Sequence, residues 1–128
     1  MKKLKIGLLL SMLFGCTNKY KQMEINEGIK AYQHDNHAIL LDVRRIDEYN
    51  SGHILDAIQY ANEDIDENIS DVLKDKNQNI YVYCRSGNRS KQAASKLVNL
   101  GYKNIIEIGG FLDYKGELKW TRWLKKNV

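Results

Sequence analysis

Short apolar runs of strand length alternate along this chain with segments that have the hydrophobic spacing of an α-helix. A short, continuous apolar run suits a strand buried on both faces, and parallel strands need a crossover segment between them. The predicted strands cover residues 38–43, 57–60, 80–83 and 105–108. The predicted helices cover residues 26–33, 63–73, 90–100 and 118–126, with a single helical turn at 47–50. This alternation predicts an α/β fold with a mostly parallel sheet of four to five strands flanked by helices.

Particular residues are expected to set the ends and the buried faces of these elements. Asn26 is the expected N-cap of the first helix, and Gly101 the C-cap of the helix over 90–100. Gly109 and Gly110 are expected to break the strand that begins at residue 105. The strand over 80–83 is expected at the centre of the sheet, because it is the most continuously apolar. The expected buried face of the helix over 63–73 consists of Ile65, Ile69, Val72 and Leu73.

The first fifteen residues have the pattern of a secretory signal peptide. Lys2, Lys3 and Lys5 precede an apolar run over residues 6–14, which is shorter than the roughly 20 residues that a membrane-spanning helix needs. The small residue Gly15 follows this run. We therefore expect residues 1–15 to be a signal peptide that directs export.

The junction after the signal peptide, Leu13-Phe14-Gly15-Cys16, resembles the lipobox of bacterial lipoproteins. This resemblance implies that Cys16 is acylated and becomes the new N-terminus. Residues 16–23 are then a lipidated tether without structure of its own, and residues 24–128 form the folded domain. The expected location is a membrane, on the periplasmic or cell-surface side, through the lipid anchor.

Charge and composition exclude several classes of protein. The chain has 128 residues with 20 Lys and Arg against 16 Asp and Glu, but three of the basic residues lie in the signal peptide. The rest of the chain is close to neutral, so no nucleic-acid partner is expected. The two cysteines form no Cys-x-x-Cys motif and the three histidines have no ligand spacing, so no metal site and no cofactor are expected.

If Cys16 carries lipid, Cys84 is the only free thiol, and its surroundings indicate chemistry. Cys84 follows a predicted buried strand, and a helix begins a few residues later. Gly87 permits a tight turn whose backbone N–H groups form an anion-binding nest, and the positive end of the helix points the same way. Arg85 and Arg89 add two cations beside it. These features favour a partly exposed, ionised thiolate nucleophile in an anion pocket.

Three ordered motifs resemble those of the rhodanese (sulfurtransferase) family over about residues 24–118. The active-site loop of that family resembles Cys84-Arg85-Ser86-Gly87-Asn88-Arg89-Ser90. Its first signature resembles Leu41-Asp42-Val43-Arg44, then Glu48-Tyr49, then Gly52-His53-Ile54 with Ala57. Its last signature resembles Gly109-Gly110-Phe111 with Tyr114. The resemblance implies a rhodanese-like fold.

The resemblance also implies a reaction and roles for the residues of these motifs. Cys84 would take the outer sulfur of a small anionic donor such as thiosulfate as a persulfide, and pass it to cyanide or to a thiol such as that of a thioredoxin-like protein. Arg85 would bind the donor, while Arg89 would either bind it or brace the loop. Asp42 and Arg44 would support the site, and His53 would bond backbone groups. The protein is expected to be a monomer.

Two other functions remain open from the sequence. Cysteine phosphatases and arsenate reductases also place Cys and Arg at the two ends of an anion loop after a strand, but with five residues between them. Only four residues separate Cys84 from Arg89, which favours a nest for a sulfur atom over one for a phosphate. The other alternative is a rhodanese-like module that binds partners without catalysis; domains of that kind commonly lack the cysteine.

Overall fold

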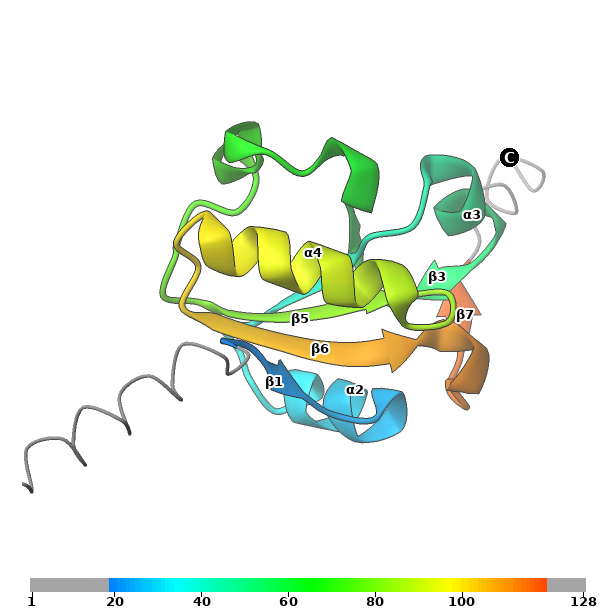
Figure 1. Ribbon diagram of the computed structural model, residues 1–128. Helices are drawn as coiled ribbons and strands as arrows, with labels where there is room; N and C mark the ends of the chain where they lie inside the picture. The colour runs from blue at the N-terminus through cyan, green and yellow to red at the C-terminus, as the bar shows by residue number, and fades with distance from the viewer. Residues whose placement is uncertain (1–18, 120–128) are drawn as a thin grey trace, which may run out of the picture.

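The computed structural model describes residues 19–119, and its centre is a five-stranded parallel sheet with helices on both faces (Figure 1). The strand order is β1-β6-β5-β2-β4, so β5 is central, as predicted. These strands are β1 (Lys21–Gln22), β2 (Ile39–Asp42), β4 (Ile58–Gln59), β5 (Asn79–Cys84) and β6 (Asn104–Gly110). The helices are α2 (Ile25–Gln33), α3 (Ile46–Ser51) and α4 (Asn88–Asn99), with short 3₁₀ helices η1 (Asn62–Asp64), η2 (Glu67–Asp71) and η3 (Phe111–Asp113).

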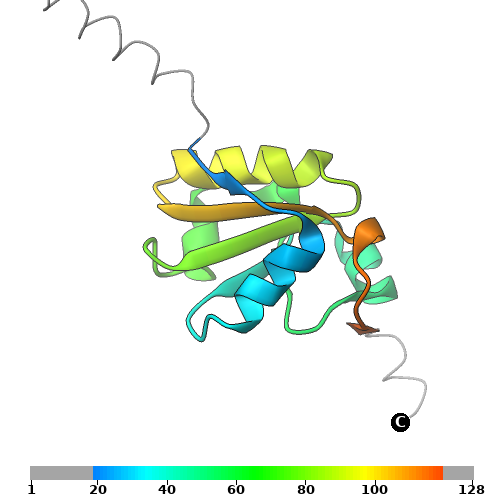
Figure 2. The same cartoon turned by 90° about the horizontal axis from the view of Figure 1, so that it is seen from below.

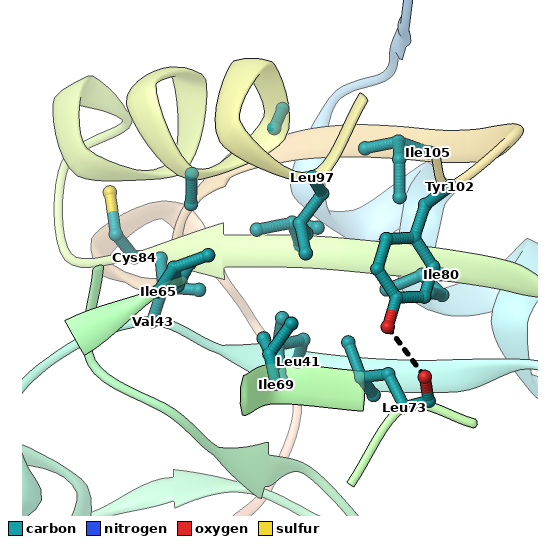
Figure 3. Packing of buried hydrophobic residues seen from close by; sticks show 13 residues of the cluster. Leu41, Val43, Ile65, Ile69, Leu73, Ile80, Cys84, Leu97, Tyr102 and Ile105 are labelled. Atoms are coloured by element: carbon teal, nitrogen blue, oxygen red, sulfur yellow. Dashed lines mark hydrogen bonds between the residues drawn. The ribbon is translucent and has the colours of Figure 1, made fainter. Parts of the chain in front are cut away.

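Two hydrophobic clusters fill the space on either side of the sheet. On one side α4, η1 and η2 cover the strands, and Leu41, Ile80 and Leu97 meet there with no exposed surface (Figure 3). On the other side α2 covers the strands (Figure 2), and Ile29 and Ile108 belong to the cluster buried there. Each central strand therefore buries both of its faces, which explains its continuous apolar sequence.

A second, two-stranded antiparallel sheet stands beside the carboxyl ends of the main strands. It pairs β3 (His53–Ile54) with β7 (Leu118–Lys119). The prediction of a helix that begins at Leu118 is wrong at its start, because Leu118 pairs with Ile54. Residues 120–126 of that predicted helix lie outside the described part of the chain.

The first helix is present, but Asn26 is not its cap. Glu24 caps α2, and its carboxylate accepts the backbone N–H groups of Asn26 at 3.0 Å and Glu27 at 3.3 Å. The side chain of Asn26 instead donates to the carbonyl oxygen of Asp113 at 2.9 Å and accepts the N–H of Lys115 at 3.0 Å. The Asn26 amide therefore makes tertiary hydrogen bonds to Asp113 and Lys115 instead of capping the helix, and the sequence pattern does not reveal these contacts.

The predicted helix over 63–73 is replaced by the 3₁₀ helices η1 and η2. Ile65 between them is extended, and the Asp66 carboxylate accepts the N–H of Asn68 at 2.9 Å. Such a local bond competes with α-helix formation. Ile65, Ile69 and Leu73 are buried as predicted, whereas Val72 is 44% exposed.

The sheet extends beyond its predicted limits at two places. The strand predicted to end before Gly109 continues through Gly110, because Gly109 adopts a positive φ of 86° and the pairing with β5 shifts register there. Lys21 and Gln22, predicted to lie in the tether, form β1 along the edge of β6. The predicted signal peptide and Cys16 lie outside the described residues. From residue 19 to residue 119, no helix is both long and apolar enough to cross a membrane.

Candidate active site

Cys84 is the last residue of the central strand β5, and its loop leads directly into α4. Gly87 occupies the N-cap position of α4 with φ 110° and ψ −13°, a left-handed conformation that glycine adopts readily. The loop therefore lies at the carboxyl edge of the parallel sheet, where ligands of such folds bind. The predicted order of strand, cysteine, glycine turn and helix is confirmed.

The Cys84 sulfur points toward the first turn of α4 (Figure 3). The backbone N–H of Gly87 donates to Sγ at 2.9 Å, and the thiol lies 3.4 Å from the hydroxyl oxygen of Ser90. The side chain is only 1% exposed, so the expectation of a partly exposed thiol is wrong. The loop turns back over the sulfur, and Val43 and Ile65 pack in the same cluster. The sulfur thus combines a buried position with two polar contacts.

Ser90 connects the sulfur to a carboxylate that sequence analysis did not assign to the site. Its hydroxyl lies 2.5 Å from Oε2 of Glu107 and 3.0 Å from the carbonyl oxygen of Gly87. Glu107 lies in the middle of β6 and is 2% exposed. A signal for it was present, since Glu107 is the one charged residue within the apolar run over 105–108.

Arg89 braces the loop from the side of α3. Its two terminal nitrogens bond to the two carboxylate oxygens of Glu48 at 2.7 and 2.9 Å. The Arg89 hydrogen bonds hold the pKa of Glu48 at about 2, and the same bonds raise the pKa of Arg89. Of the two roles that the sequence left open for Arg89, this geometry favours bracing.

The remaining loop residues face outward. Arg85, Ser86 and Asn88 are exposed, and within residues 19–119 the guanidinium of Arg85 makes no hydrogen bond or ion pair. The backbone of Arg85 is fixed nevertheless, because its carbonyl oxygen accepts the N–H of Leu112 at 3.2 Å. Arg85 is therefore an exposed positive charge on the Cys84 loop, and its guanidinium is accessible to an anion.

Asp42 and Arg44 form a buried framework at the end of the neighbouring strand β2. The Arg44 guanidinium bonds to both oxygens of Asp42, the shortest contact being 2.7 Å, and it also donates to the carbonyl oxygen of Gly52. The Tyr83 hydroxyl donates to Asp42 at 2.7 Å, and burial together with that carboxylate raises the Tyr83 pKa far above its usual range. This network joins the end of β2 to Tyr83, the residue before Cys84 in β5.

His53 has the backbone-bonding position that was predicted for it. Its ring nitrogen Nδ1 lies 2.9 Å from the carbonyl oxygen of Tyr49, and its ring stacks on the Tyr49 ring with 3.7 Å between centroids. Phe111 packs under the Arg44 guanidinium at 4.0 Å. Among the described residues, no group of three His, Cys, Asp or Glu side chains is placed to hold a metal ion.

Comparison with protein families gives a match over most of the chain. Residues 25–117 match the rhodanese-like domain family, and this stretch includes every element from α2 to η3. The match contains the Cys84 loop and the Asp42–Arg44 framework.

Individual relatives are consistent with that match. The chain is 34% identical over 73 residues to the thiosulfate sulfurtransferase PspE of Escherichia coli, covering 57% of this chain and 70% of PspE. It is 35% identical over 104 residues to a tRNA uridine(34) hydroxylase of Hamiltonella defensa, covering 77% of this chain but 28% of that enzyme. A solved structure described as a rhodanese with anions from E. coli superimposes with a TM-score of 0.60 at 30% identity, covering 65% of this chain and 98% of that one.

Proposed function

Because this chain belongs to the rhodanese-like domain family, we propose that it is a sulfurtransferase that carries sulfane sulfur on Cys84. The donor is a small sulfur-containing anion such as thiosulfate, and the acceptor is a thiol or cyanide. The observation that carries the proposal is the position of Cys84 Sγ, which receives the Gly87 N–H at 2.9 Å at the start of α4. That position favours a negative charge on sulfur.

The transfer needs two displacements and no further reactant. In the first, the Cys84 thiolate attacks the outer sulfur of thiosulfate, the S–S bond of the donor breaks, and sulfite leaves with the electron pair. Cys84 then carries a persulfide whose terminal sulfur is anionic. In the second, an acceptor thiolate or cyanide attacks that terminal sulfur, and Cys84 leaves as the thiolate. Covalent catalysis of this kind gives ping-pong kinetics.

The persulfide itself is the direct test. Incubation of the full chain with thiosulfate should add one sulfur, about 32 Da, to the intact mass, as a covalent intermediate requires. Cyanide should remove it. The variant Cys84→Ser should gain no mass, whereas the matched variant Cys16→Ser should gain it as the wild type does. A wild type that stays unmodified with thiosulfate and with other sulfane donors would support the partner-binding alternative instead.

Arg85 is proposed to capture the donor anion, and this role gives a kinetic prediction. Loss of a charge-assisted hydrogen bond of about 1.5–3 kcal/mol should lower kcat/KM of Arg85→Ala by about 10- to 100-fold, with a smaller effect on kcat. Arg85→Lys should retain part of the activity, because it keeps the charge. Lys103→Ala, which removes an exposed cation at the opposite end of β6, is the control. Equal kcat/KM values for Arg85→Ala and the control would exclude this role.

The pairing of Arg89 is the observation that weighs against phosphatase chemistry. In a phosphatase the arginine that closes the loop binds the phosphate, whereas both terminal nitrogens of Arg89 are engaged by Glu48. Hydrolysis of an aryl phosphate by the wild type, without sulfur loading from thiosulfate, would favour the phosphatase alternative.

A further inference from the structure

Glu107 is a buried carboxylate without a cationic partner among the described residues. Its oxygens accept hydrogen bonds from Gln22 Nε2 at 3.2 Å, from the Gly109 N–H at 2.8 Å and from the Ser90 hydroxyl at 2.5 Å. All three donors are neutral, and none of the ion pairs within residues 19–119 includes Glu107. Three hydrogen bonds from neutral donors can hold one ionised carboxylate at a position only 2% exposed, but no cation pairs with it among the described residues to offset a second anion on the nearby sulfur. A proton on Glu107 avoids the cost of two buried anions whenever Cys84 is a thiolate.

The same carboxylate is linked to the reactive sulfur by a single side chain. The Ser90 oxygen lies 3.4 Å from Cys84 Sγ and 2.5 Å from Glu107 Oε2, and Ser90 has no exposed surface. Because a hydroxyl has one hydrogen, Ser90 can donate to the sulfur or to the carboxylate, but not to both. The Gly87 carbonyl oxygen at 3.0 Å is a third acceptor for the same hydrogen, and it can give none in return.

Two arrangements of protons satisfy these positions without moving a heavy atom. With Glu107 ionised, Ser90 donates to the carboxylate and turns a lone pair toward Sγ, which suits a neutral thiol. With Glu107 protonated, the carboxyl group donates to the Ser90 oxygen, and the Ser90 hydrogen is free to point at a thiolate. The second arrangement adds a hydrogen bond to the one that Gly87 N–H already gives the sulfur.

We propose that Glu107 is a positioning residue that holds a proton while Cys84 is a thiolate, and that it acts on the sulfur through the Ser90 hydroxyl. In this transfer the S–H bond of Cys84 breaks as an O–H bond forms on Ser90, and the original Ser90 O–H bond breaks as one forms on Glu107. No other reactant is needed. The inference rests on the proposed function only in taking the thiolate as the reacting form of Cys84.

This arrangement gives the proton of the buried Cys84 thiol an acceptor within the site. Cys84 is 1% exposed, so solvent has little direct access to its proton. A proton held on Glu107 stays within the site when the thiolate attacks a donor. The Ser90 hydrogen bond also stabilises the thiolate when it leaves the persulfide. The pair of Cys84 and Glu107 then shares one negative charge, because ionising both would place two anions near one another in the interior.

Infrared spectroscopy of the full chain tests where the proton is. At neutral pH the wild type should show the C=O stretch of a protonated carboxyl group, and carbon-13 labelling of glutamate should shift that band. Glu107→Gln should lose the band, whereas the matched variant Glu67→Gln, at an exposed position of η2, should keep it. Cys84→Ser should also lose the band, because no thiolate then opposes ionisation of Glu107.

The outcomes of this experiment are decisive in both directions. A wild type without the band has an ionised Glu107, and the proposal is wrong. A band that persists in Cys84→Ser shows a carboxyl group protonated by burial alone, without coupling to the thiol, and the proposal is again wrong. The comparison of wild type with Cys84→Ser, combined with the isotope label, gives a result even if Glu107→Gln does not fold.

A second measurement follows the sulfur. The ultraviolet absorbance of the thiolate, taken as the difference between each protein and its Cys84→Ser counterpart, should rise at the same pH in the wild type and in Glu107→Gln, because glutamine imitates the protonated acid. If the wild-type thiolate forms beside an ionised Glu107, removal of that charge should move the rise to lower pH. That shift would overturn the proposal.

Neither measurement uses a sulfur donor. Failure of sulfur loading in the mass experiment would therefore leave the infrared and absorbance results intact, and the two proposals can fail separately.

Discussion

The ion pair between Glu48 and Arg89 joins α3 to the first turn of α4 beside the Cys84 loop. The Arg89 hydrogen bonds lower the pKa of Glu48 from its usual 4.5 to about 2. Because this pKa is lower in the folded than in the unfolded state, the stabilisation is complete above pH 4.5 and is lost as the pH falls toward 2. We expect Glu48→Gln to lower the free energy of unfolding by about 1 kcal/mol at neutral pH, and by much less near pH 2.

Urea unfolding of wild type and variant across this acid range measures the effect. Asp47→Asn is the matched control, since Asp47 pairs with Arg45 at 3.3 Å but both side chains are more than half exposed. Exposed pairs contribute little, so the control should follow the wild type. Equal acid losses of stability in wild type and Glu48→Gln would show that the pair carries no pH dependence.

Single side chains differ in how far the sequence could place them. The position of Cys84 was predictable, because a buried strand precedes it and a glycine turn and a helix start follow it, but its burial was not. The bracing of Arg89 was not, because Glu48 lies 41 positions away in the sequence and only the packing of α3 brings it close. Glu107 carried a local signal, a charge inside an apolar strand, but its contact with Ser90 follows from the register of β6 on β5.

At the level of strands and loops, the close approach of β6 to the Cys84 loop has a testable consequence. A Cβ atom added to Gly110 would lie 2.5 Å from the Ser86 Cα atom and would also fall on the Arg85 carbonyl oxygen. Gly110→Ala should therefore displace the loop. Because misplacement of reacting groups by about 1 Å can cost about 100-fold in rate, we expect a loss of that order in sulfur loading.

The control for this variant is Gly101→Ala at the far end of α4. Gly101 has a φ of 99°, and only the Lys76 side chain lies within contact of an added Cβ atom. It should lose about 1 kcal/mol of stability through backbone strain and keep the wild-type rate of sulfur loading. Rates are followed by intact mass after thiosulfate. A wild-type rate for Gly110→Ala would mean that the loop tolerates displacement from this side.

The elements that were predicted correctly are those whose own sequence determines them. β2 and β5 have continuous apolar runs, and α4 has a clear helical stripe. The C-cap of α4 is Leu100 rather than the predicted Gly101, which follows it with a φ of 99°. The segment over 63–73 has a helical stripe as well, but the Asp66 side chain bonds locally and divides it. The edge strand β1 has two residues and forms only because β6 offers an unpaired edge, which no local pattern reveals.

For the chain as a whole, the alternation of strand and helix patterns was sufficient to predict a parallel sheet covered on both faces. The small β3–β7 sheet could not be predicted from that alternation, since it pairs His53 and Ile54 with residues 64 or more positions later in the sequence. Pairing of that kind depends on tertiary contacts between short segments. The site nevertheless lies where the alternation places it, at the carboxyl ends of the central strands.

The entry of the chain into the sheet bears on how a membrane anchor would present the site. β1 runs parallel to β6, so its first residue, Lys21, lies toward the end of the sheet opposite the Cys84 loop (Figure 1). The tether between Cys16 and β1 is then residues 17–20, which at about 3.5 Å per residue reach at most about 14 Å. An anchor on Cys16 would hold the domain close to a bilayer with the loop directed away from it.

We propose, from the basic and apolar pattern of residues 1–15 and the cysteine that follows it, that the protein is exported and acylated at Cys16. Two acyl chains or more, at about 0.8 kcal/mol per buried CH₂ group, would keep it in the membrane fraction. Cells grown with a radioactive fatty acid should label the wild type. Cys84→Ser, which removes the other thiol, should be labelled equally, whereas Cys16→Ser should be unlabelled and should leave the membrane fraction. An unlabelled wild type found in the cytoplasm would show that export and anchoring are wrong, while the sulfur chemistry of Cys84 would stand on its own experiment.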